Sequence, residues 1–289
     1  MKAALKYLFL WIALMIVGCG VIIVICRVAS LLIPGYTFNT RDLFADSLQG
    51  SVVQVIATQV LPIAVFLKRR YTSFSIDFKF SYGEGFSKKK LYLWAAVAGV
   101  GCLLFDIMVV MTFPVLDEWN LKIFGEDPDV NINFVDMISG CILAPLIEEA
   151  IFRGAIERRL LEKAWNPWFA IVISAIFFAI PHGSIYIFFS FFGLLVGWVY
   201  YRTGCVWPGI VIHAVNNILV LLPAFIDEVI LGNDSFDDDL SLSLGVSIPL
   251  LIVSFTILAY SVWQIAVLTK NRTPIKAQQE PLDMMEFQD

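Results

Sequence analysis

Charged residues are scarce in this chain: 16% of its 289 residues are Asp, Glu, Lys or Arg, while 59% are hydrophobic. Soluble globular chains carry about 25% charged residues. Long polar blocks are absent between the apolar runs, and no internal repeat is visible. The composition therefore argues against a soluble enzyme, and the lack of a repeat gives no support to an inverted-repeat transporter. It predicts an all-α, polytopic membrane protein.

Cysteine is also sparse, and the metal-binding spacings are missing. The five cysteines lie in apolar surroundings without a CxxC pair, and no HExxH occurs. This excludes a disulfide framework or a zinc knuckle as the basis of the fold, and we interpret the cysteines as packing residues. We expect the lipid bilayer as a partner and no nucleic acid; no pattern in the sequence predicts the oligomeric state.

Apolar stretches long enough to cross a hydrocarbon core of about 30 Å occur eight times. They cover residues 7–26, 51–67, 91–113, 134–156, 167–183, 185–201, 206–223 and 246–269. With eight spans, 17 of the 20 Lys and Arg fall on one side of the membrane. Because cytoplasmic loops are rich in Lys and Arg, both termini are predicted to be cytoplasmic, and the membrane is the plasma membrane if the source is bacterial.

Three regions follow from this layout. We expect N-terminal helices with a basic cytoplasmic loop over 1–133, a catalytic core over 134–223, and an acidic loop, a last helix and a polar tail over 224–289. The loop over 68–90 is interpreted as a topogenic positive-inside loop, with anionic lipid or an acidic partner as the alternative. The tail over 273–289 is predicted to be disordered.

Ionisable residues inside a span cost about 2.5–3.5 kcal/mol each on insertion scales, so they mark candidate functional sites. The fourth span carries Glu148, Glu149 and Arg153. Glu149 and Arg153 are four residues apart and share a helix face, whereas Glu148 is turned about 100° away. The spacing predicts a structural Glu149–Arg153 ion pair that supports the site, and it leaves Glu148 free. Asp106, in the third span, is interpreted as a hydrogen-bonded structural group outside the site.

Both histidines of the chain lie in apolar runs. His182 and Glu148 are each 17 residues from the turn near Trp165, so they are predicted to lie at similar depth on an antiparallel hairpin. That depth requires the arm with Arg158 and Arg159 to protrude into the cytosol.

His213 and Asn217 are four residues apart and share one face of the seventh span. His213 is only about nine residues from the turn at Gly204. Its predicted depth therefore matches that of Glu148 and His182 less well, unless the helix tilts or the turn lies inside the membrane. Gly193 and Gly197 form a small-xxx-small pair that predicts close helix packing.

A carboxylate and an imidazole in a water-poor cavity can deprotonate water. We assign Glu148 as the general base and His182 as the residue that orients the water or shares the proton. His213 and Asn217 are predicted to donate to the oxyanion. Phe178 is a substrate-contact candidate that can stack on the site or on substrate.

Three motifs carry a family resemblance: Glu-Glu-x-x-x-Arg at 148–153, Phe-x-x-x-His at 178–182 and His-x-x-x-Asn at 213–217. Together they resemble the CPBP family, which includes CAAX prenyl endopeptidases and bacteriocin-processing or self-immunity proteins. The resemblance covers about 140–222. It implies an eight-helix intramembrane glutamate protease that uses no cofactor and acts on a protein or peptide substrate. In such a protease the residues matching Glu148 and His182 act on water, and those matching His213 and Asn217 stabilise the oxyanion.

Three alternatives stay open. A zinc protease can use Glu148, His182 and His213 as ligands. A non-enzymatic immunity or scaffold protein can bind a peptide in the same cavity. A proton-coupled transporter can also use intramembrane Glu and His.

Overall fold

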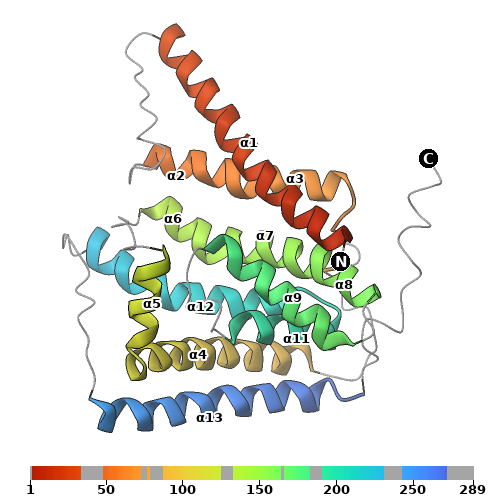
Figure 1. Cartoon of the computed structure of the whole chain (residues 1–289), viewed down its shortest axis with the longest axis vertical. Coiled ribbons are helices and arrows are strands. Elements are labelled where there is room, and N and C mark those ends of the chain that lie inside the picture. Colours follow the sequence, from red (N-terminus) through yellow and green to blue (C-terminus); the bar gives the residue numbers. More distant parts are fainter. Residues whose placement is uncertain are drawn as a thin grey trace.

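The computed structural model describes residues 2–33, 48–72, 77–78, 87–124, 133–163, 166–182, 191–230 and 243–271. Within these ranges the regular elements are helices, and no strand occurs. The prediction of an all-α fold is confirmed, and Figure 1 shows the helices stacked as a bundle with α1 crossing one side. The predicted disordered tail over 273–289 lies outside the described residues.

The helices follow the predicted spans closely. In chain order they are α1 (Lys2–Leu32), α2 (Leu48–Val55), η2 (Ile56–Val60), α3 (Leu61–Lys68), α4 (Lys88–Thr112), α5 (Val115–Phe124), α6 (Phe134–Ile138), η3 (Ser139–Leu143), α7 (Ala144–Ile151), η4 (Phe152–Glu157), α8 (Arg158–Lys163), α9 (Pro167–Ala179), η5 (Ile180–His182), α11 (Phe192–Thr203), α12 (Trp207–Phe225), η6 (Ile226–Ile230) and α13 (Leu244–Leu268).

Each of the eight predicted stretches overlaps one of these helical runs. In the described part of the chain, five runs are long and apolar enough to cross a membrane: 2–32, 50–68, 88–112, 207–225 and 244–268. The protein is therefore an integral, multi-pass membrane protein, and the number eight stays a prediction. The run over 134–163 is long enough, but Asp136, Glu148, Glu149 and Arg153 interrupt its apolar character. The short helix α5 was not predicted.

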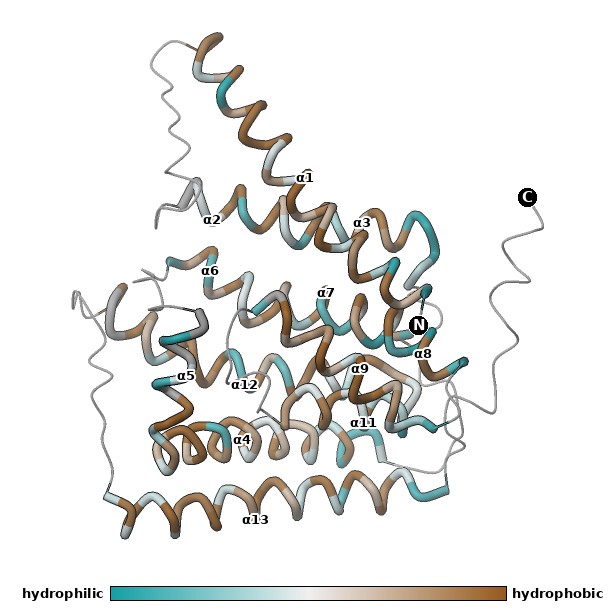
Figure 2. Tube along the Cα trace, viewed as in Figure 1, coloured by the Kyte–Doolittle hydropathy of each residue, from teal (hydrophilic) through white to brown (hydrophobic). Residues whose placement is uncertain are grey.

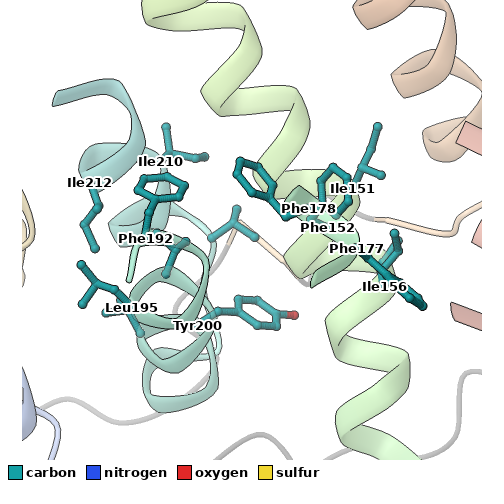
Figure 3. Packing of buried hydrophobic residues seen from close by; sticks show 14 of the residues in the cluster. Ile151, Phe152, Ile156, Phe177, Phe178, Phe192, Leu195, Tyr200, Ile210 and Ile212 are labelled. Atoms are coloured by element: carbon teal, nitrogen blue, oxygen red, sulfur yellow. The ribbon is translucent and has the colours of Figure 1, made fainter. Parts of the chain in front are cut away.

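The helices that carry the candidate site lie in the middle of the bundle. α12 packs on α4, which in turn packs on α13 at one edge, and α11 packs on α9. α12 also contacts α7, and α1 contacts η2 and η4 at the other edge. Figure 3 shows the apolar core between these layers, with Phe178 and Phe192 pointing toward one another from opposite helices. Apolar side chains therefore fill the space between the helices that carry the candidate site.

The first and last described residues lie at the same end of the bundle, as Figure 1 shows for the start of α1 and the end of α13. Hydrophilic segments gather at this end, including the ends of α3, α8 and α13, while the helix middles are hydrophobic (Figure 2). This arrangement agrees with an even number of spans. That this end is cytoplasmic stays a prediction from the positive-inside rule.

Close contact between α4 and α12 brings the His213 helix into the bundle and yields a prediction. A Cβ on Gly99 would lie 2.8 Å from the backbone oxygen of Ile212, an atom that cannot move independently of α12. We expect Gly99→Ala to lower the free energy of unfolding by about 1–3 kcal/mol, the usual cost of overpacking. Thermal unfolding in detergent measures this change.

Gly20→Ala is the matched control, because a Cβ on Gly20 in α1 has nothing within 4 Å. This substitution should leave the unfolding temperature unchanged or raise it, since Ala is the better helix former. Equal unfolding temperatures for Gly99→Ala and the wild type would contradict the packing described for α4 and α12.

Candidate active site

Glu148 lies near the middle of the helical run over 134–163, with 18% of its side chain exposed. Its Oε2 atom is 3.7 Å from His182 Nε2 and 3.9 Å from His213 Nε2. These separations are too long for direct hydrogen bonds. Oε2 is also a buried atom without a hydrogen-bond partner in the described part of the chain. The structure thus brings Glu148 and both histidines together and leaves a carboxylate oxygen facing them.

His182 is oriented by its own helix end. α9 tightens into the 3₁₀ turn η5, in which the carbonyl of residue 178 would bond to the N–H of residue 181. Residue 181 is Pro and has no N–H, so this carbonyl is left for another donor. His182 Nδ1 lies 2.7 Å from Phe178 O, and since a carbonyl only accepts, Nδ1 carries the hydrogen. Nε2 of a neutral His182 is then an acceptor that faces Glu148.

His213 is held by a residue that the sequence analysis assigned to another role. Its Nδ1 lies 3.0 Å from Glu149 Oε1, and only 6% of its side chain is exposed. Gly209, one turn earlier in α12, lies against the same carboxylate, because a Cβ there would be 3.3 Å from Glu149 Oε2. His213 is therefore hydrogen-bonded to Glu149 through Nδ1, while its Nε2 faces Glu148 at 3.9 Å.

The predicted Glu149–Arg153 ion pair is present, with Arg153 Nη1 3.1 Å from Glu149 Oε1 and both side chains fully buried. Arg153 also donates to Gly193 O (3.3 Å) and has its Nε 3.9 Å from Glu157 Oε2. It is thus the central cation of a buried Glu–Arg–Glu row spaced at i, i+4 and i+8. Glu157 was missed from the sequence, although this spacing was visible.

Phe178 packs on the site residues. Its ring centroid is 4.5 Å from that of His182 and 5.7 Å from that of His213, and the Arg153 guanidinium lies 4.8 Å from it. Since only 3% of Phe178 is exposed, the ring stacks on the site, the first of the two contacts predicted for it. Its role as a substrate contact stays a prediction.

Asn217 is held by a hydrogen bond to a carbonyl whose backbone donor is missing because of a proline. In the π-helical segment η3, Ala144 N–H bonds to Ser139 O, and the next bond would join residue 145 to Gly140 O. Residue 145 is Pro, so Gly140 O accepts instead from Asn217 Nδ2 at 2.8 Å. An amide nitrogen has two hydrogens, so one stays available to a substrate oxygen. In the described contacts Asn217 does not touch Glu148 or the histidines directly.

Glu148 and His182 lie at the same level, as their equal distances from one turn predict. The arm with Arg158 and Arg159 is not solvated, however. These residues are 0% and 5% exposed, because Tyr71, Asp77 and α1 pack on the end of this helix. The turn before α12 is packed against protein too, with Cys205 fully buried. That the arm extends beyond the membrane into the cytosol stays a prediction.

Three further expectations concern residues outside the catalytic cluster. The five cysteines form no disulfide within the described residues, and Cys102, Cys141 and Cys205 are buried, as expected of packing residues. Asp106 has Cys102 Sγ 3.6 Å from its Oδ2 and lies outside the site. The Gly193–Gly197 pair packs closely as predicted, since a Cβ on Gly193 would lie 2.9 Å from the Ala175 Cβ.

The zinc alternative concerns Glu148, His182 and His213. Among the described residues, no group of three or more His, Cys, Asp or Glu side chains has the arrangement of a metal site. The Nε2 atoms of His182 and His213 lie almost 4 Å from the same Glu148 oxygen. Zinc ligands lie about 2.0–2.2 Å from the metal, so donor atoms of one zinc site can be nearly 4 Å apart. Zinc therefore stays an alternative, and a chelator distinguishes it from a mechanism that uses protein groups alone.

Fold and site together define a class: a polytopic helical membrane protein with a partly buried cluster of Glu148, His182 and His213. Residues 130–219 match the family model described as "Type II CAAX prenyl endopeptidase Rce1-like". A Bacillus subtilis (strain 168) protein named "Putative membrane peptidase YdiL" is 33% identical over 88 residues, which are 30% of this chain and 36% of that protein. The chain thus spans about a third of the length of this curated relative. No solved structure shows significant similarity. The predicted resemblance to the CPBP family of membrane proteases is confirmed over this segment.

Proposed function

We propose that this protein is an intramembrane endopeptidase that hydrolyses a peptide bond of a membrane-associated protein or peptide. The observation that carries the proposal is the position of Glu148 Oε2, which is without a hydrogen bond in the described residues and lies within 4 Å of two imidazole nitrogens. The match over 130–219 supports the same reaction class. The first three spans lie outside the match, and we assign no substrate class from them.

In the proposed reaction, Glu148 and His182 Nε2 accept the two hydrogens of a water molecule between them. Glu148 takes one proton, the water oxygen attacks the carbonyl carbon, and the carbonyl electron pair moves to its oxygen. The proton then passes to the amide nitrogen, the C–N bond breaks, and a carboxylic acid and an amine leave. The partial exposure of Glu148 (18%) and His182 (28%) gives water access to this side of the site.

His213 and Asn217 are the proposed donors to the oxyanion. Because Nδ1 of His213 already donates to Glu149, Nε2 can donate only when the ring carries both hydrogens. The Glu149 carboxylate then balances the imidazolium charge. The second hydrogen of Asn217 Nδ2 supplies the other donor, oriented by Gly140 O.

The test is hydrolysis by the purified protein in detergent micelles of a fluorogenic peptide library, with and without a metal chelator. We expect cleavage at the same rate under both conditions, because the proposed chemistry uses only protein groups. Loss of activity with the chelator and its return with zinc would replace the proposed mechanism by the zinc-dependent one. A folded protein that binds peptides from the library and cleaves none would be a peptide-binding protein instead.

A further inference from the structure

Asp77 is a buried carboxylate in a stretch predicted to be a solvated basic loop. It lies between the second and third spans, yet its exposed fraction is 0%. Burial of a carboxylate is costly unless charges and donors compensate it. The Lys and Arg of a loop set the topology of the chain, and an Asp that faces the core contributes little to it. The burial of Asp77 therefore indicates a specific attachment.

Asp77 is compensated by three other segments of the chain. Arg158 Nη1 lies 3.0 Å from Oδ1 in an ion pair with no exposed side-chain surface, and Tyr200 OH donates to the same oxygen at 3.4 Å. Thr72 Oγ1 donates to Oδ2 at 3.0 Å. The backbone oxygen of Asp77 accepts from Val206 N–H at 2.9 Å. One residue thus joins the ends of α8, α11 and α12.

These segments carry the candidate site. Arg158 follows Glu148 by ten residues on one helical run, or about 15 Å, and Val206 precedes His213 by seven, or about 10 Å. The attachment is tight: a Cβ on Gly154 would lie 2.8 Å from Thr72 Oγ1. Arg158 Nη2 also donates to Tyr71 O at 2.8 Å, so the segment is held on both sides of residues 73–76.

We propose that Asp77 is a positioning residue that sets the distance between Glu148 and His213 by clamping the ends of their helices. This inference rests on the proposed peptidase function. Glu148 Oε2 and His213 Nε2 are 3.9 Å apart, so an axial shift of either helix changes this distance directly. A 1 Å displacement of reacting groups can cost on the order of 10²-fold in rate.

Asp77→Asn is the informative variant, because it keeps the side-chain shape and removes the charge that holds Arg158. We expect kcat for a cleaved peptide to fall roughly 10- to 100-fold with KM little changed, measured well below the unfolding temperature. Arg202→Gln is the matched control. Arg202 donates to Thr269 Oγ1 (3.1 Å) and Thr269 O (2.7 Å), so it ties α11 to α13 and does not join the Glu148 helix to the His213 helix.

Hydrogen–deuterium exchange supplies a readout that does not depend on activity. In Asp77→Asn we expect faster exchange over 158–163 and 206–213. In Arg202→Gln we expect faster exchange only near the end of α13, and kcat per folded molecule should be unchanged. If Asp77→Asn does not fold, Tyr200→Phe removes a single donor and should give the same pattern with a fall in kcat of about 2- to 10-fold.

Three outcomes would overturn the inference: wild-type kcat in the Asp77 variant, an equal fall in kcat in Arg202→Gln, or unchanged exchange over 206–213. A wild-type protein that cleaves no peptide would overturn the proposed function instead. In that case faster exchange over 206–213 in Asp77→Asn still establishes the clamp as a mechanical link.

Discussion

Glu148→Gln should lower kcat for peptide cleavage severely while the protein stays folded. The amide has the shape of the carboxylate, but it cannot take a proton from water. General-base catalysis contributes on the order of 10²–10⁴-fold, so we expect kcat to fall by that factor. Peptide binding should persist, because Glu148 Oε2 makes no hydrogen bond that holds the described helices together. The measurement is single-turnover cleavage together with peptide binding by the same preparation.

Asp106→Asn is the matched control for this experiment. Asp106 is also a carboxylate in a membrane-spanning helix, but its described contact is with Cys102 in α4 and not with the site. We expect its cleavage rate to equal that of the wild type. Wild-type turnover in Glu148→Gln would refute Glu148 as the base. Equal losses in both variants would indicate a general requirement for charge in the bundle.

Sequence reasoning found those parts of the site that depend on helix periodicity. The four-residue spacing predicts the Glu149–Arg153 pair and leaves Glu148 turned away, as the structure shows. Equal distances from one turn place Glu148 and His182 at one level. These results need only the rise and rotation per residue, which are fixed for any α-helix.

Helix periodicity could not predict contacts between helices that are distant in sequence. The Glu149–His213 hydrogen bond and the Asp77–Arg158 pair join residues 64 and 81 positions apart, and periodicity does not say which faces meet. The sequence reading also treated charged residues near helix ends as solvated. Arg158 and Arg159 are instead buried, and Arg158 contacts Tyr71 and Asp77 from the segment that follows α3.

Arg153→Met should produce the largest loss of stability in the chain. Arg153 compensates two fully buried carboxylates, Glu149 at 3.1 Å and Glu157 at 3.9 Å. Removal of one partner from a buried ion pair costs about 3–5 kcal/mol, since a charge is left without compensation. The Phe178 ring also loses the guanidinium 4.8 Å away. Thermal and denaturant unfolding in detergent measure the change in the free energy of unfolding.

The double variant Glu149→Gln/Arg153→Met separates charge compensation from packing. If charge dominates, the double variant should be more stable than Arg153→Met alone, because one uncompensated carboxylate is gone. Lys122→Met is the matched surface control: Lys122 and Glu118 are also an i, i+4 pair, 3.9 Å apart, but their side chains are 72% and 67% exposed. We expect no measurable change there, because exposed pairs contribute little. If Arg153→Met is as stable as Lys122→Met, the Glu–Arg–Glu row does not stabilise the helical run over 134–163, and Glu149 must orient His213 without the support of Arg153.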